Sequence, residues 1–118
     1  MKVIALVFLI MFTFSVKANS VTCNNTDSLN ALIAINPVVK VSPKYPNKGT
    51  QKPIDGCAVI TFSLDRDQPT SVPKKMKVEY ATEKRFGKAS KKALSKWLYI
   101  NKHLPDSKRY YMVFRFDV

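Results

Sequence analysis

The sequence predicts an α+β fold: a small antiparallel three-stranded sheet, one helix packed across it, and a short N-terminal helix before them. Three observations indicate this fold. Apolar residues alternate with period two after Asp55-Gly56, and they then follow a helical stripe from Phe86 to Trp97. They alternate again in the aromatic stretch that closes the chain. At 118 residues the chain holds one domain at most.

The chain opens on a segment typical of protein export. Lys2 precedes a nearly unbroken apolar run, Val3 to Val16, which has the length of a signal-peptide core and is short for a membrane-spanning helix. Small residues favour cleavage after Ala18 or Ser20. We therefore expect residues 1–18 to be a signal peptide, and an uncleaved inner-membrane anchor is the alternative.

Both cysteines, Cys23 and Cys57, follow the expected cleavage site. An exported chain meets oxidising conditions, so we expect a Cys23–Cys57 disulfide that ties the N-terminal arm to the first strand. A pair of unlinked thiols is the alternative. We expect no metal site, because two cysteines and one histidine without ligand spacing do not form one.

The chain is strongly basic, with a formal net charge of +12 from 20 lysines and arginines against 8 acidic residues. This charge suggests an anionic partner such as a lipid surface, a polysaccharide or an acidic protein patch, although solubility and steering are the plainer explanation. Lysine outnumbers arginine, which argues against nucleic-acid readout.

The N-terminal arm, residues 19–36, should carry the short helix. Ser28 can cap it, apolar residues follow at helical spacing as far as Ile33, and Pro37 would end it. The next segment, residues 37–53, holds four prolines and should run extended.

The first two strands should form a hairpin. The first begins at Cys57. Its apolar residues alternate with semi-polar ones, so one face should form the core and the other should be partly exposed to water. The second is predicted over Lys74 to Ala81. The residues predicted to face the core are Ala58, Ile60, Phe62 and Leu64 in the first strand, and Met76, Val78 and Tyr80 in the second.

The helix and the final strand complete the predicted core. The apolar stripe of the helix is Phe86, Ala89, Ala93, Leu94 and Trp97, with lysines on the other side. Its alanines allow the helix axis to approach the sheet closely. The final strand, Tyr110 to Val118, should cover the helix face with its alternate aromatic residues.

The sequence gives no sign of an enzyme. His103 is the only histidine and lies in a polar loop, and no nucleophile–base spacing or phosphate-binding loop is present. We therefore expect neither catalysis nor a cofactor.

The order of these motifs resembles the C-terminal domain of TonB, and the resemblance covers residues 37–118. The pattern is a PxYP segment, a glycine-led strand that ends in an acidic turn, a helix with alanines and a Trp-containing end, and a VxFxL-like final strand. The residues that carry it are Pro43-Lys44-Tyr45-Pro46, Asp55-Gly56 through Asp65, Phe86 with Ala89, Ala93, Leu94, Trp97 and Tyr99, and Val113-Phe114-Arg115-Phe116.

The resemblance implies a periplasmic module that binds the TonB box of outer-membrane receptors and supports TonB-dependent transport. In that family the box adds as a strand beside the last strand, near the PxYP segment. An open edge strand also presents unpaired N–H and C=O groups, which independently favours this mode. The candidate peptide-binding residues are Ser42, Pro43, Lys44, Tyr45, Pro46, Tyr110, Tyr111, Met112, Val113, Phe114, Arg115 and Phe116.

Two other functions stay open. The chain could be an envelope interaction module that forms a homodimer through its edge strand or holds an anionic surface with its lysines. It could also be a short membrane-anchored energy transducer. For the PxYP segment, the alternative to peptide binding is a packed turn in which Tyr45 covers the core.

Overall fold

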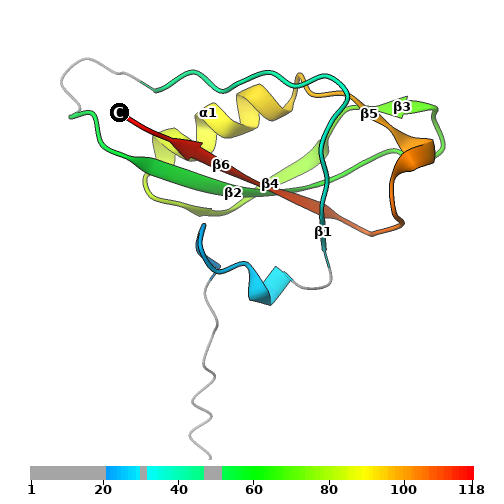
Figure 1. Cartoon of the computed structure of the whole chain (residues 1–118), viewed down its shortest axis with the longest axis horizontal. Coiled ribbons are helices and arrows are strands. Elements are labelled where there is room, and N and C mark those ends of the chain that lie inside the picture. Colours follow the sequence, from blue (N-terminus) through cyan, green and yellow to red (C-terminus); the bar gives the residue numbers. More distant parts are fainter. Residues whose placement is uncertain (1–20, 30–31, 47–51) are drawn as a thin grey trace, which may run out of the picture.

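The computed structural model describes residues 21–29, 32–46 and 52–118. One helix, α1 (Lys84–Leu94), lies across a four-stranded sheet with the order β1-β6-β2-β4 (Figure 1). Strands β2, β4 and β6 pair antiparallel, so the predicted three-stranded sheet with a helix packed across it is confirmed. The strands of this sheet are β1 (Ile33–Ala34), β2 (Gly56–Ser63), β4 (Lys74–Ala81) and β6 (Tyr110–Phe116).

Two short strands form a separate ribbon beside the main sheet. Strand β3 (Thr70–Ser71) pairs with β5 (Tyr99–Ile100), so the connection between β2 and β4 is a wide loop and no tight hairpin turn. Two 3-10 turns, η1 (Asp27–Leu29) and η2 (Asn101–His103), complete the elements. The expected signal peptide lies outside the described residues. Within the described ranges, none of the helices has the length and hydropathy needed to cross a bilayer.

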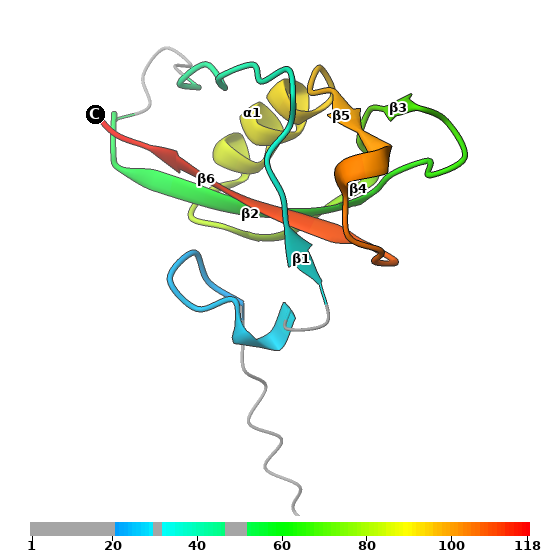
Figure 2. The ribbon, with the colours of Figure 1, turned by 45° about the vertical axis from the view of Figure 1, so that its right-hand side comes forward.

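The central strand β2 is buried on both faces. Ala58, Ile60 and Phe62 face α1 and are fully buried, as predicted. Val59 and Thr61 alternate with them and are fully buried too, so the expectation of a partly wet second face is wrong at these positions. The N-terminal arm lies on the side of the sheet to which this second face is turned (Figures 1 and 2). Strands β4 and β6 flank β2 on either side.

Strand β4 departs from simple alternation. Val78 pairs with Ile60, whereas Tyr80 pairs with Val59, because the register shifts between these two pairs. A bulge of this kind places two residues of one strand opposite one of its partner. Tyr80 therefore shares the face of Val59, and the prediction that it faces the core alongside Val78 is wrong.

The helix stripe is confirmed. Phe86 and Leu94 are fully buried, and Trp97, which follows the helix end, is 1% exposed. The indole Nε1 of Trp97 donates a hydrogen bond of 2.7 Å to the carbonyl of Val41. The end of the helix layer is thereby joined to the extended segment that precedes Tyr45.

In the described parts of the arm, residues 21–29 and 32–36, the predicted N-terminal helix is not present as such. The structure shows only the 3-10 turn Asp27–Leu29, and the apolar residues Ile33 and Ala34 form β1, parallel to Tyr110 and Tyr111 of β6. So short a helix is marginal in water on its own. The unpaired edge of β6 offers the same backbone groups a tertiary partner, and this pairing prevails over local spacing.

The disulfide between Cys23 and Cys57 is confirmed, with an S–S distance of 1.99 Å. It fixes the N-terminal arm to the face of β2 that is turned away from α1. Arg115 adds a second attachment, because its guanidinium donates to the carbonyl of Cys23 at 3.2 Å and to Oδ1 of Asn24 at 3.0 Å.

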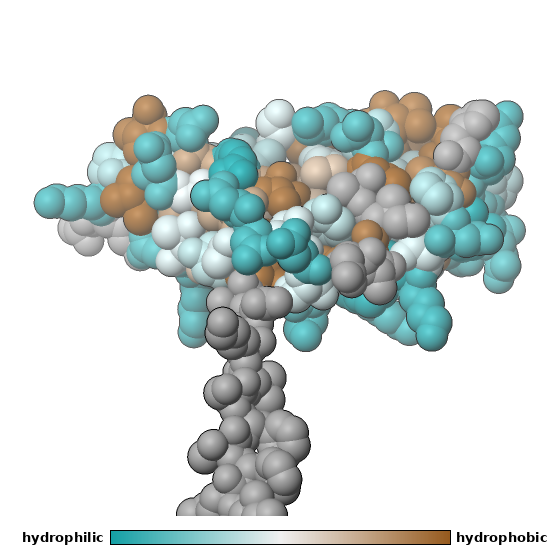
Figure 3. All heavy atoms as spheres, turned by 60° about the horizontal axis from the view of Figure 1, so that its bottom comes forward, coloured by the Kyte–Doolittle hydropathy of each residue, from teal (hydrophilic) through white to brown (hydrophobic). Residues whose placement is uncertain are grey.

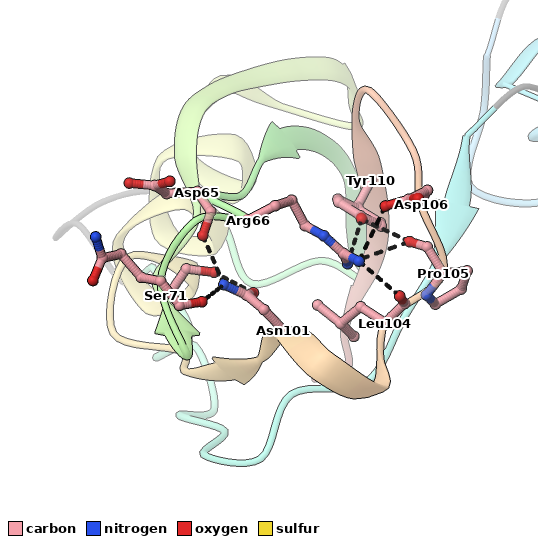
Figure 4. Close-up of polar contacts among 9 residues, drawn as sticks. Asp65, Arg66, Ser71, Asn101, Leu104, Pro105, Asp106 and Tyr110 are labelled. Atoms are coloured by element: carbon pink, nitrogen blue, oxygen red, sulfur yellow. Dashed lines mark hydrogen bonds and ion pairs between the residues drawn. The ribbon is translucent and has the colours of Figure 1, made fainter.

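A polar cluster fastens the loop after β2 to the connection that follows α1 (Figure 4). The side-chain amide of the buried Asn101 donates to the carbonyls of Asp65, at 2.6 Å, and Gln68. Ser71 Oγ donates to Asn101 Oδ1 at 2.8 Å. Asn101 thus satisfies the polar groups of a loop that carries little regular structure of its own.

Arg66 extends the same cluster towards β6. Its guanidinium donates to the carbonyl of Leu104 at 3.0 Å and to the hydroxyl of Tyr110 at 3.2 Å, and it forms an ion pair with Asp106 at 3.1 Å (Figure 4). The Tyr110 hydroxyl in turn donates to the carbonyl of Pro105 at 2.8 Å. These contacts fix the start of β6, so the cluster is structural.

Candidate functional site

The first candidate site is the outer edge of β6. Strand β2 pairs with the inner side of β6 along its whole length, from Phe116 to Tyr110. Strand β1 occupies the outer side at Tyr110 and Tyr111 only (Figure 2). Within the described residues, no strand pairs with the outer side of Met112–Phe116. The expectation of an edge that is open from Tyr110 onward is therefore corrected at its first two residues.

Because several side chains of β6 are buried, mainly its backbone is available to bind a peptide at this edge. Tyr110, Phe114 and Phe116 point into the core and are at most 5% exposed. Met112 is half-buried and packs against the same core. Recognition at this edge would therefore depend on main-chain hydrogen bonding, with side-chain contacts limited to the opposite face of the strand.

The other edge of the sheet, that of β4, is protected. Lys74, Lys75 and Lys77 are exposed along it, and Lys75 adopts a positive φ of 50°. The register with β2 shifts twice. Lysines and bulges are the devices by which edge strands avoid pairing with other chains. The regular edge of β6 carries neither device between Met112 and Phe116.

The PKYP segment, Pro43 to Pro46, lies beside the helix layer. Tyr45 packs edge-on against Phe86 and Phe116, at ring-centroid distances of 5.9 Å and 6.4 Å. These contacts agree with the alternative in which the PKYP segment is a packed turn and Tyr45 covers the core. The two halves of the predicted peptide site meet at the contact between Tyr45 and Phe116.

A groove of about 500 Å³ runs between this segment and α1. Its floor carries the small residues Ala89 and Ala93, which leave room between the helix and the extended chain. Its basic lining residues are Lys44, Arg85, Lys88, Lys92 and Lys96, and the remaining ones are Val41, Ser42, Pro43, Tyr45 and Pro46.

Arg85 holds one end of the groove in place. It is 8% exposed and donates to the carbonyls of Lys52, at 2.8 Å, and Pro46, at 3.4 Å. It also forms an ion pair with Glu83 at 3.1 Å. The sequence predicts the helix lysines on the side away from the core, but it does not predict that the PKYP segment lies opposite them. Their spacing along a helix without acidic residues was the available signal.

The rest of the described surface offers no comparable docking face. Large exposed hydrophobic residues are scattered, as at Val38, Val72 and Val118. On the underside of the molecule as drawn in Figure 1, hydrophobic side chains form small patches separated by hydrophilic ones (Figure 3). Isolated patches of this kind are usual on soluble proteins.

A comparison with protein-family models, one with curated proteins and one with solved structures each give no match for this chain. The resemblance to TonB therefore remains a prediction carried by the motifs, and the site has to be argued from its geometry.

Proposed function

We propose that this chain is an exported TonB-like module that binds an extended peptide of an outer-membrane receptor by strand addition along Met112–Phe116. The observation that carries this proposal is the asymmetry of β6, which is paired along its whole inner side but, by the described residues, only at Tyr110 and Tyr111 on its outer side. A three-stranded antiparallel sheet with one helix across it supports the same resemblance.

The open edge sets the character of the binding. Alternate residues of an edge strand direct their N–H and C=O groups away from the sheet, so only about half of the backbone groups of Met112–Phe116 can receive a peptide. Each such hydrogen bond contributes about 0.5–1.5 kcal/mol net. We therefore expect modest affinity and fast exchange, as suits a contact that is made and broken repeatedly.

Amide hydrogen exchange tests the proposal directly. A TonB-box peptide at saturating concentration should slow exchange and shift the amide resonances within Met112–Phe116. A matched control peptide carries N-methyl groups on alternate backbone amides. It keeps its side chains but cannot donate the main-chain hydrogen bonds to β6, so it should bind much more weakly. If saturating peptide leaves these amides unmoved, strand addition at β6 is wrong.

Two measurements separate this function from its alternatives. Sedimentation without peptide reports self-association, and a dimer that protects the same amides would favour a structural interaction module. The N-terminal sequence of the native protein reports processing. A start after Ala18 or Ser20 supports an exported module, and an intact Met1 supports a membrane-anchored transducer.

A further inference from the structure

Three lysines, two in α1 and one in the turn that follows it, form a row along the groove. Lys88, Lys92 and Lys96 follow one another at intervals of four residues, and all three line the groove opposite the PKYP segment. Lys44 adds a cation from the facing wall. The ammonium group of Lys40 lies 5.7 Å from the ring centroid of Trp97, which packs beyond the end of the helix. Positive charge therefore surrounds a cavity whose floor is made of alanine.

Folding accounts for only part of this arrangement, because Lys92 lies in the last turn of α1, where a cation complements the helix dipole, whereas Lys88 has no such role. Helix α1 carries no acidic residue between Lys84 and Leu94, and like charges at intervals of four residues destabilise a helix. The ion pairs of the described part of the chain involve Arg66, Lys74, Lys77 and Arg85, and none of them reaches the lysine row. The row is thus a concentration of charge that other residues of the described chain leave uncompensated.

We propose that this groove, here named the lysine groove, binds an acidic segment of a partner protein in extended conformation. The site is distinct from the β6 edge and does not depend on strand addition there. The lysine row would neutralise carboxylates on one side of the bound segment. The opposite wall would contact its remaining side chains through the half-buried residues Val41, Pro43 and Tyr45.

The spacing of the row fits such a segment. Lys88 and Lys92, four residues apart on α1, are separated by about 6 Å along its axis, and Lys96 follows in the turn after the helix end. Alternate residues of an extended chain point the same way and recur every 6.4–6.8 Å or so. Acidic side chains at every second position of an extended peptide therefore match Lys88 and Lys92 one for one, and Lys96 extends the row beyond the helix end.

The facing wall favours a peptide over a lipid headgroup. Ser42 and Lys44 are exposed, and their main-chain groups make no hydrogen bond to other residues of the described chain. They are available to a second extended backbone, which a lipid does not offer. The groove is also walled on two sides, whereas a membrane surface requires an open basic face.

The test uses a dye-labelled peptide of about eight residues in which glutamates alternate with valines, titrated into the purified protein by fluorescence anisotropy. A Lys88→Gln/Lys92→Gln/Lys96→Gln variant should lose at least about tenfold in affinity, since it removes the charge partners of three carboxylates. A Lys75→Gln/Lys102→Gln/Lys108→Gln variant changes net charge equally at exposed lysines outside the groove. It should keep its affinity within about twofold to threefold.

Several outcomes would overturn the proposal. Equal losses in both variants would show a general charge effect without a site. A peptide with glutamine in place of glutamate that binds equally well would remove the role of the lysines. Vesicles containing phosphatidylglycerol that bind through the same three lysines, with no binding of the acidic peptide, would make a membrane the occupant. Circular dichroism spectra that match the parent protein exclude misfolding as the cause of a loss.

Amide shifts keep this proposal separate from the proposed function. The acidic peptide should perturb Ser42, Lys44, Ala89 and Ala93 and leave Met112–Phe116 unmoved. Perturbation confined to Met112–Phe116 would contradict the lysine groove and would be consistent with strand addition. The two proposals can thus fail independently.

Discussion

The phenol oxygen of Tyr45 makes two hydrogen bonds to Ile54. It donates to the carbonyl of Ile54 at 2.7 Å and accepts from its N–H at 2.8 Å. The ring of Tyr45 meanwhile packs against Phe86 and Phe116 at the end of the core. One side chain therefore covers the core, forms part of the lysine groove and joins the PKYP segment to the residues that lead into β2.

The change Tyr45→Phe removes both hydrogen bonds and keeps the ring. We expect a loss of about 1–2 kcal/mol in the free energy of unfolding, because each typical bond contributes about 0.5–1.5 kcal/mol. Urea denaturation measures it. Tyr45→Ala should cost more, since it also opens a cavity against Phe86. If Tyr45→Phe unfolds at the same urea concentration as the parent, the hydroxyl has no structural role.

The disulfide should provide much of the stability of this small domain. Cys23 and Cys57 are 34 residues apart in sequence, and a crosslink over that distance contributes about 3–4 kcal/mol in the loop-entropy description. Thermal melts with and without reducing agent measure this contribution. A Cys23→Ser/Cys57→Ser variant, which should be insensitive to the reducing agent, is the control. A parent protein whose melting temperature does not change on reduction would contradict the prediction.

Two glycines should respond in opposite ways to alanine. A Cβ on Gly56 would lie 2.2 Å from Cε2 of the buried Phe86, so Gly56→Ala should destabilise by about 1–3 kcal/mol through overpacking. A Cβ on Gly87 would lie 3.1 Å from Cγ1 of Val78, which stands on an exposed edge strand and can shift.

Gly87→Ala should therefore stabilise by several tenths of a kcal/mol, because alanine is favoured over glycine within a helix by about 1 kcal/mol. Chemical denaturation of both variants gives the comparison. A neutral Gly56→Ala would mean that Phe86 does not pack against β2 in the manner described.

Alkaline pH should weaken the fold through Tyr99. Burial raises the pKa of Tyr99 above its ordinary value near 10, because the charged phenolate is poorly solvated in the core. The unfolded chain ionises at the ordinary pKa while the folded chain does not. Stability from Tyr99 is therefore complete below about pH 10 and is lost as the pH rises further.

Denaturation of the parent protein and of Tyr99→Phe at about pH 8 and pH 11 tests this expectation. The variant should lose less stability between the two values than the parent does. If the parent and the Tyr99→Phe variant lose equal stability between these pH values, the alkaline sensitivity arises from groups other than Tyr99.

The core could be predicted from sequence because its periodicities are local. The alternation of Ala58, Ile60 and Phe62 and the stripe from Phe86 to Trp97 both depend on the geometry of a single element. All of these residues are buried except Ala89, which is half-buried at the groove. The motif order also predicted the antiparallel three-stranded sheet with one helix across it, since short connections and one helix leave few topologies open.

The N-terminal arm could not be predicted in the same way. Whether Ile33 and Ala34 form helix or strand depends on the edge of β6, more than 70 residues away in sequence (Ile33↔Tyr110, 110 − 33 = 77). The wet face expected for Val59 and Thr61 fails for a similar reason, because tertiary neighbours such as Glu79 and Arg109, which hydrogen-bond Thr61, lie over it. Bulges such as that between Val78 and Tyr80 also reflect tertiary pairing and leave no clear local signal.

The candidate site was predicted in part. Motif resemblance located the PKYP segment and β6, but it gave no information on β1, which takes the first two positions of the edge. The lysine groove could not be predicted, because its two walls are some 40 residues apart in the sequence, from Lys44 to Lys88. Only packing of the helix beside the extended segment brings them together.

The disulfide also decides how the domain would respond to tension. A pull on the chain before Cys23 passes through the sulfur–sulfur bond directly into β2, the strand at the centre of the sheet. The residues between the two cysteines, which include β1 and the PKYP segment, carry none of that load. We therefore expect a pull at this end of the chain to load the sheet at β2 before it strains the hydrogen bonds of the arm.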